Sequence, residues 1–208
     1  NILIKNGKIA KITNKELNSD STIDAKSNFV LPGLIDCHVH FREPGLTHKE
    51  DFLTGSMAAA KGGVTTILDM PNTLPPTTTI SALEEKRKLA AKSIVNYGLI
   101  FGAAKDNIAD IKKAKNIAAV KLYMDYTTGD LKVNDFEAMA EIFKISKMTI
   151  IHAEEENVKN AVDILAKTKI KNKLHVAHVS SAKELSYAKS NKIKNQITTE
   201  VTPHHLFM

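Results

Sequence analysis

Residues 33–42 read GLIDCHVHFR, an apolar strand-like run that ends in two histidines and an arginine. Side chains alternate between the two faces of a β-strand, so His38 and His40 are expected to point the same way. Arg42 has the same parity and would carry its cation just beyond them. Two adjacent imidazoles provide half of a metal site. Taken alone, a His-x-His pair is more often two partly exposed histidines near a strand end, so the rest of the chain must decide.

Apolar strand-like segments alternate with helical segments after residue 32. The predicted strands are 33–40, 64–70, 96–101, 118–123, 148–152, 174–178 and 196–201. Helix starts are predicted where a capping residue precedes a glutamate by three positions, at Thr47, Ser81, Asn134 and Ser181. Repeated strand–helix units predict an α/β protein with a parallel sheet and helices outside it. Seven strands in one series favour a (β/α)8 TIM-type barrel over a doubly wound sheet.

The length of the chain limits this barrel. A complete barrel takes about 250 residues, and this chain stops at Met208, just after the seventh predicted strand. We therefore expect residues 31–208 to form strands one to seven of a barrel whose strand eight is absent. Residues 1–30 are predicted to be the N-terminal part of a small β-domain, with strand segments at 2–4, at 8–12 and near 21–25.

Composition narrows the classes of function. The chain has 208 residues, a net charge of +6 and 5% aromatic residues. The positive charge comes from lysines that we expect on solvated helix surfaces: Lys86, Lys88, Lys112, Lys113 and Lys115. The sequence has no basic patch interleaved with aromatic residues, so it does not indicate nucleic-acid binding. It also has no apolar run that approaches the length of about 18 residues that a membrane span needs. The single cysteine, Cys37, favours a reducing compartment such as the cytoplasm and is predicted to be buried, facing away from the histidines.

Further metal-competent side chains recur at the ends of the later predicted strands. Lys121 lies in the fourth strand, His152 ends the fifth and His178 ends the sixth. Four imidazoles at one end of a barrel suit zinc or a similar metal, and they are too many for one catalytic zinc with an open position. They suit two metal ions that share a bridging ligand. A charged Lys121 would be repelled there, so it is outside the site, neutral or modified into an anion.

Residues 33–45, GLIDCHVHFREPG, resemble the signature of dihydroorotases of the cyclic amidohydrolase superfamily. Further segments of this family follow in the same order: DMPNT at 69–73, KLY at 121–123, HAE at 152–154, HVS at 178–180 and EVTPHHL at 200–206. The resemblance spans the whole chain. The Arg-Glu-Pro-Gly and Met-Pro-Asn-Thr segments are specific to the family, whereas His-x-His marks only the superfamily.

The resemblance implies a role for each matched residue. It implies that His38 and His40 bind one zinc ion, that His152 and His178 bind a second, and that a carboxylated Lys121 bridges both. Two zinc or similar divalent ions per complete subunit are the implied cofactors. Arg42 and Asn72 would hold a substrate carboxylate, which the planar fork of an arginine binds well.

The reaction implied by the resemblance is the reversible hydrolysis of L-dihydroorotate to N-carbamoyl-L-aspartate in pyrimidine biosynthesis. A metal-bound hydroxide would attack the cyclic amide. The general base of the family is an aspartate at the end of strand eight, expected beyond Met208, so the chain as given is predicted to be catalytically incomplete. The implied partners are the small-molecule substrate, a second copy in a homodimer and aspartate transcarbamoylase.

Two alternatives stay open. An allantoinase or hydantoinase would use the same metal residues on another cyclic ureide, although Arg42 favours a substrate with a carboxylate. A non-catalytic homologue could instead serve as a scaffold for aspartate transcarbamoylase. Other acidic residues receive structural interpretations: Asp36 supports the first strand, Asp69 either supports the metal ligands or caps a loop, and Asp125 is a weak alternative ligand.

Overall fold

The structure is a computed structural model that describes residues 1–127, 130–189, 193 and 195–207. It divides into two compact units, Asn1–Pro32 and Gly33–Met208. Each unit has its own secondary structure, and each is described separately below.

The first unit contains an antiparallel hairpin of β1 (Ile2–Lys5) and β2 (Lys8–Ile12). Asn6 and Gly7 join the strands with φ angles of 53° and 71°, the left-handed conformation that these two residue types adopt most readily in tight hairpins. The strand segment predicted near 21–25 does not form. The Asp24 carboxylate instead accepts a hydrogen bond from the Lys26 amide and starts a turn.

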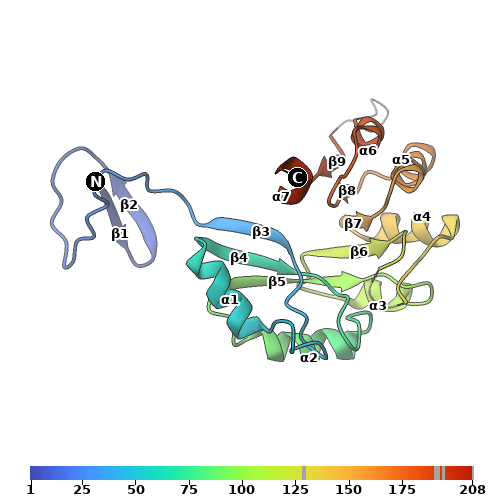
Figure 1. Ribbon diagram of the computed structural model, residues 1–208, viewed down its shortest axis with the longest axis horizontal. Helices are drawn as coiled ribbons and strands as arrows, with labels where there is room; N and C mark the ends of the chain where they lie inside the picture. The colour runs from blue at the N-terminus through green and yellow to red at the C-terminus, as the bar shows by residue number, and fades with distance from the viewer. Residues whose placement is uncertain (128–129, 190–192, 194, 208) are drawn as a thin grey trace. The chain divides into compact units, whose positions relative to one another are not determined.

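The second unit is a series of strands and helices around one parallel sheet (Figure 1). The strands are β3 (Leu34–Val39), β4 (Val64–Asp69), β5 (Asn96–Gly102), β6 (Ala119–Tyr123), β7 (Met148–His152), β8 (Lys173–Val176) and β9 (Ile197–Thr199). The helices are α1 (Phe52–Lys61), α2 (Ile80–Ala90), α3 (Ile108–Lys113), α4 (Phe136–Ile145), α5 (Glu156–Thr168), α6 (Ala182–Ala188) and α7 (Pro203–Phe207). All seven predicted strands of this unit are present, with ends that differ by one or two residues.

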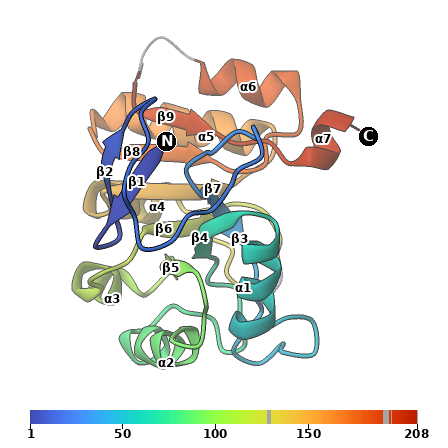
Figure 2. The same ribbon diagram turned by 90° about the vertical axis from the view of Figure 1, so that its left-hand side faces the viewer.

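The strands pair in chain order from β3 to β9, each parallel to the next. The sheet curves, and helices α1 to α6 lie along its outer side (Figures 1 and 2). Aligned strands bring their C-terminal ends to one edge: Gly102 pairs with Lys121, and Tyr123 pairs with His152. Any functional side chains at these ends are therefore close in space.

Apolar side chains fill both faces of the sheet. The larger cluster, between sheet and helices, includes Phe101, Val120 and Ile151. A smaller cluster contains Met70, Ile100, Ala119, Ile150 and Ala177, which alternate along the strands with members of the larger one. The smaller cluster therefore lies on the inner face of the curved sheet. Lys121 shares its parity with Ala119, and His152 shares its parity with Ile150, so both belong to this inner face.

Only one of the four predicted helix caps is confirmed. The Ser181 side chain accepts a hydrogen bond from the Glu184 amide at the start of α6. The helices α1, α2 and α4 are capped by Asp51, Thr79 and Asp135 instead. In each case the cap is the residue directly before the first helical residue. The three-residue spacing to a glutamate predicted the helix but misplaced its start.

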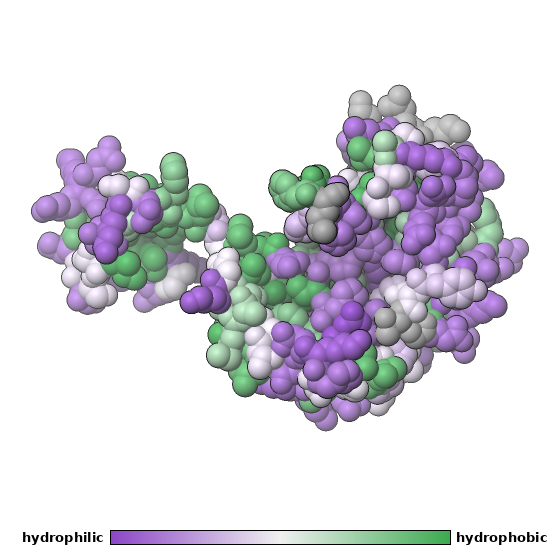
Figure 3. Space-filling model, in the orientation of Figure 1, coloured by the Kyte–Doolittle hydropathy of each residue, from purple (hydrophilic) through white to green (hydrophobic). Residues whose placement is uncertain are grey.

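Hydrophilic residues cover the outward side of α4, α5 and α6 (Figure 3), as expected for a lysine-rich surface. Two predictions about exposure are wrong. Lys86 is fully buried rather than solvated. Cys37 is exposed rather than buried, and so are the other three of the first four residues of β3. Within the described ranges, none of the helices combines the length and the apolar character needed to cross a bilayer.

Candidate functional site

Four histidines from three strand ends form one cluster of rings. The Nε2 atoms of His38 and His40 are 3.2 Å apart, and Nδ1 of His152 is 2.9 Å from Nε2 of His178. The two pairs meet where the ring centroids of His38 and His178 are 5.5 Å apart. The structure thus brings together the four histidines that the sequence selected.

The distances within each pair fit two nitrogen ligands on one cation. Zinc–nitrogen bonds of about 2.0–2.1 Å at a tetrahedral angle separate two ligand nitrogens by about 3.3 Å. The pair distance assigns Nδ1 of His152, which faces His178, to a cation, and the other ring nitrogen, Nε2, is buried without a hydrogen-bond partner among the described residues. These observations fit metal ligation by this set of side chains.

The described residues contain no group of three or more His, Cys, Asp or Glu side chains placed to hold one metal ion. The histidines form two pairs, and the fifth predicted ligand is a lysine. The arrangement therefore differs from a three-histidine zinc site. It fits two cations that each take two histidines and share a further ligand.

Neighbouring side chains orient the first pair of histidines. Nδ1 of His40 lies 2.7 Å from Oδ1 of Asn72, and Nδ1 of His38 contacts the Glu200 carboxylate. An acceptor at Nδ1 favours the tautomer that carries its proton there, which leaves a lone pair on Nε2. Both Nε2 atoms are thereby prepared to bind a cation.

Burial lowers the pKa values of His40, His152 and His178. Desolvation, together with the nearby His38 and Arg42, lowers the pKa of His40 to about 3. Desolvation and the Lys121 ammonium lower the pKa of His178 to about 4 and also lower the pKa of His152. Neutral imidazole is the form that binds metals, so these rings need not lose a proton first.

Lys121 lies on the inner face, 1% exposed, and its Nζ atom has no hydrogen-bond partner among the residues that the structure describes. Desolvation lowers the pKa of its amine to about 7, partly opposed by Glu200. A buried ammonium without a partner costs free energy. The site therefore favours either the neutral amine or a modified, anionic form of this lysine.

Arg42 and Asn72, the predicted substrate-binding pair, occupy different surroundings. Nη1 of Arg42 is buried, and within the described part of the chain it has no hydrogen-bond partner, so this guanidinium offers a donor close to His40. Asn72 is 4% exposed, and its Oδ1 atom is taken up by His40. Only the amide nitrogen of Asn72 is left for a ligand.

A buried ion pair supports the strand ends that carry these residues. Nζ of Lys86 lies 2.5 Å from Oδ2 of Asp69 and donates to the Met70 carbonyl at 2.7 Å. Oδ1 of Asp69 accepts a hydrogen bond from the Phe41 amide at 2.7 Å. Asp69 thus joins the chain after β3 to the end of β4, which agrees with the loop-capping role, one of the two that the sequence left open.

Sequence reasoning missed three residues of the site, which are Glu200, His175 and Tyr123. Glu200, just after β9, contacts His38 and lies 3.1 Å from Nε2 of His175. Burial opposes ionisation of Glu200, but the hydrogen bonds from His175 and His38 outweigh it and lower its pKa well below the ordinary value. Tyr123 is buried with an unpartnered hydroxyl group. The parity of Tyr123 with Lys121, and the position of Glu200 at a strand end, were the available signals.

Two carboxylates have structural roles. Oδ1 of Asp36 accepts from the His38 amide at 3.0 Å, as expected for a residue that supports the first strand. Asp125 accepts from the amide of Glu154 and from the side chain of Asn157, each at 2.8 Å. Both contacts tie a loop together, so Asp125 is engaged in a loop rather than directed to a metal.

Comparisons with known proteins agree with this geometry. The dihydroorotase of Methanosarcina acetivorans is 38% identical over an alignment of 253 positions, which covers 100% of this chain and 54% of that protein. An L-hydantoinase (dihydropyrimidinase) structure from Arthrobacter aurescens matches with a TM-score of 0.88 at 26% identity, covering 100% of this chain and 55% of that one. A dihydroorotase structure from Saccharomyces cerevisiae, in complex with 5-fluoroorotic acid, matches 84% of this chain and 57% of its own length at a TM-score of 0.59 and 25% identity.

The chain spans about half the length of the curated relatives that it matches. The predicted TIM-type barrel fold is confirmed, and the curved seven-stranded sheet is a part of such a barrel. The family model described as dihydro-orotase-like matches residues 27–168, well over half of the sequence. The chain therefore belongs to the dihydro-orotase-like family.

Proposed function

We propose that this chain is the metal-binding part of a dihydroorotase, which reversibly hydrolyses L-dihydroorotate to N-carbamoyl-L-aspartate. The observation that carries the proposal is the convergence of two histidine pairs with a buried, unpartnered lysine. Hydrolysis joins a water oxygen to the ring carbonyl carbon, breaks the ring carbon–nitrogen bond and places a proton on the nitrogen.

His38, His40, His152 and His178 would hold two divalent cations, with Lys121 between them. When bound, such cations lower the pKa of water and polarise a carbonyl group. The chain contributes imidazoles, of which His40 is held in position by Asn72 and His38 by Glu200.

We infer that Lys121 is carboxylated in the loaded protein. A neutral amine can add to carbon dioxide, forming a nitrogen–carbon bond and releasing one proton, and burial lowers the pKa of Lys121 to about 7. The product is an anion with two oxygen atoms, which would remove the conflict between an ammonium and two cations. The absence of a hydrogen-bond partner for Nζ supports this inference.

Arg42 is proposed to bind the carboxylate of the substrate. Its unpartnered Nη1 atom offers a donor, and a guanidinium binds carboxylates in a planar, two-bond geometry. We assign proton transfer to neither Asp69 nor Glu200, because Asp69 pairs with Lys86 and Glu200 pairs with His38 and His175.

The test is an assay on the full-length protein, loaded with zinc, for conversion of L-dihydroorotate to N-carbamoyl-L-aspartate. Arg42→Ala should raise KM by about ten- to a hundredfold, the equivalent of a lost hydrogen-bonded charge. Hydantoin and allantoin, which lack the carboxylate, serve as competing substrates. A preference for either of them would favour the hydantoinase or allantoinase alternative.

Bound metal without turnover of any of the three substrates would favour a non-catalytic scaffold, for which aspartate transcarbamoylase is the proposed partner. Co-sedimentation of the two proteins would then test that association. The unpartnered donors of Arg42 and Lys121 favour the catalytic proposal, since a pure scaffold would not need them.

A further inference from the structure

Arg42 has a backbone conformation that ordinary residues avoid. Its φ angle is +64°, in the left-handed region where a side chain with a Cβ atom is strained. Such a conformation persists only where the surrounding structure holds it. The contacts on either side of Arg42 therefore determine where its guanidinium lies.

The residue before Arg42 is fixed by the buried pair described above. The Phe41 amide donates to Asp69, and Asp69 is held by Lys86. All of these groups are buried, so this side of Arg42 is attached to the end of β4 and to α2.

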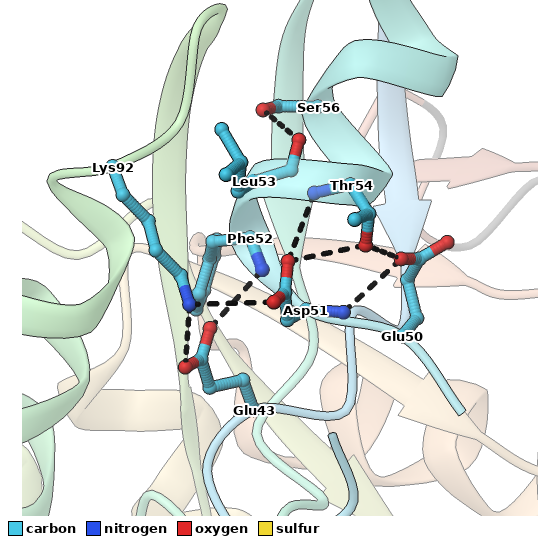
Figure 4. Close-up of polar contacts among 8 residues, drawn as sticks. All are labelled: Glu43, Glu50, Asp51, Phe52, Leu53, Thr54, Ser56 and Lys92. Carbon is cyan, nitrogen blue, oxygen red and sulfur yellow. Dashed lines mark hydrogen bonds and ion pairs between the residues drawn. The ribbon is translucent and has the colours of Figure 1, made fainter. Parts of the chain in front are cut away.

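Glu43, the residue after Arg42, is held in place through its own carboxylate (Figure 4). Glu43 is 6% exposed, and its Oε2 atom accepts from the Phe52 amide at 3.1 Å, at the first residue of α1. Its Oε1 atom accepts from Nζ of Lys92 at 2.8 Å, and Lys92 also lies 3.5 Å from Oδ2 of Asp51, the cap of α1.

The segment that carries Lys92 is itself anchored. It follows α2, and the Ile94 amide donates to the hydroxyl group of Ser56 on α1 at 3.0 Å. That hydroxyl donates in turn to the Leu53 carbonyl at 2.9 Å. The side chain of Ser56 is fully buried, so Lys92 is presented to Glu43 from a fixed segment.

We propose that Glu43 and Lys92 are positioning residues that hold Arg42 in its strained conformation and so aim its guanidinium at the anionic group of the substrate. The proposal rests on the proposed function, in which Arg42 binds a carboxylate. Lys92 is more than a third exposed, so its contribution comes from fixing buried Glu43 rather than from a strong isolated ion pair.

The first experiment measures the conformation directly, on the zinc-loaded full-length protein. The Leu46 amide donates to the Arg42 carbonyl at 3.0 Å, so its hydrogen exchange reports whether this turn is held. Glu43→Gln and Lys92→Met should accelerate that exchange by about tenfold. Lys112→Met is the matched control, because it removes a similar exposed pair with Glu141 elsewhere. Unchanged exchange at Leu46 in both test variants would overturn the proposal.

The second experiment measures transmission to Arg42 with two probes that differ by one carboxylate, orotate and uracil. Glu43→Gln should weaken orotate binding by about tenfold, leave uracil binding unchanged, and cause no further loss in an Arg42→Ala background. An equal loss in both backgrounds would overturn the positioning role. If the wild-type protein binds orotate no better than uracil, the carboxylate role of Arg42 in the proposed function fails, and the exchange experiment still decides the proposal.

Discussion

The substitution Lys86→Met tests the buried support beneath the site. Lys86 and Asp69 are both fully buried, with Nζ 2.5 Å from Oδ2. Methionine has a similar length and is apolar, so it fills much of the space while removing the charge. The Asp69 carboxylate would then keep one buried donor, the Phe41 amide.

The expected loss of folding stability follows from the charge that remains buried after the substitution, the Asp69 carboxylate. Breaking a buried ion pair by removing one partner costs about 3–5 kcal/mol, because the other charge stays buried without compensation. For a protein of this size, that cost corresponds to a fall in melting temperature of about 6–20 °C. Lys88→Met is the matched control, since Lys88 is exposed on the same helix and should change stability by less than about 0.5 kcal/mol.

The assay is urea unfolding followed by far-ultraviolet circular dichroism, because the chain has no tryptophan. Burial raises the pKa of Asp69, and Lys86 opposes that rise. In the Lys86→Met variant, the pKa of Asp69 is higher in the folded protein than in the unfolded chain. Stability is therefore lost as the pH rises through the folded-state pKa of Asp69, because the folded protein then contains a buried anion. The variant should therefore lose more stability relative to wild type at about pH 8 than at about pH 5. The lower pH is closer to the pKa of aspartate in an unfolded chain, about 3.9.

Two results would refute this reasoning. A deficit below about 1 kcal/mol would show that the pair does not hold two compensating charges. A deficit that grows as pH falls would show that Asp69 is stabilised as an anion by groups other than Lys86.

Three further predictions concern the site and the loop that follows β3. Lys121→Ala should reduce zinc content, measured by elemental analysis, from about two ions per protein to about one or fewer, whereas unchanged content would remove this lysine from the ligand set. Glu200→Gln should weaken zinc affinity by about 10- to 100-fold through its contact with His38, measured by competition with a chelator, and an unaltered affinity would contradict its orienting role. Gly45→Ala should destabilise the protein by more than about 1 kcal/mol, measured by thermal unfolding. Gly45 has a φ of +84°, and an added Cβ would lie 2.0 Å from the Leu74 carbonyl oxygen. A variant as stable as the wild type would mean that this loop can move to accommodate the Cβ.

The strands and most of the site could be predicted because their signals are local. Apolar runs of five to seven residues mark the strands, and alternation along each strand puts His38 with His40. Parallel βα units place the C-terminal ends of all strands at one edge. His152 at the end of β7 and His178 just after β8 could therefore be assigned to the same site before any distance was known.

Helix starts and the exposure of single residues depended on groups that the local sequence does not reveal. Thr47, three positions before a glutamate, looks like a cap, yet the helix begins after Asp51, whose side chain accepts from the Thr54 amide. Lys86 resembles its neighbours on a lysine-rich helix. It is buried because its ammonium reaches the end of β4, where it donates to the Met70 carbonyl and pairs with Asp69.

The sequence by itself predicted the series of seven strands and the four histidines that we propose as metal ligands. Only the tertiary structure decided which groups hold those side chains in place. Glu200 lies 162 residues from His38 along the chain, and Asn72 lies 32 residues from His40. Such contacts arise from the curvature and register of the whole sheet, because periodicity specifies a face of a strand but not the partner across it.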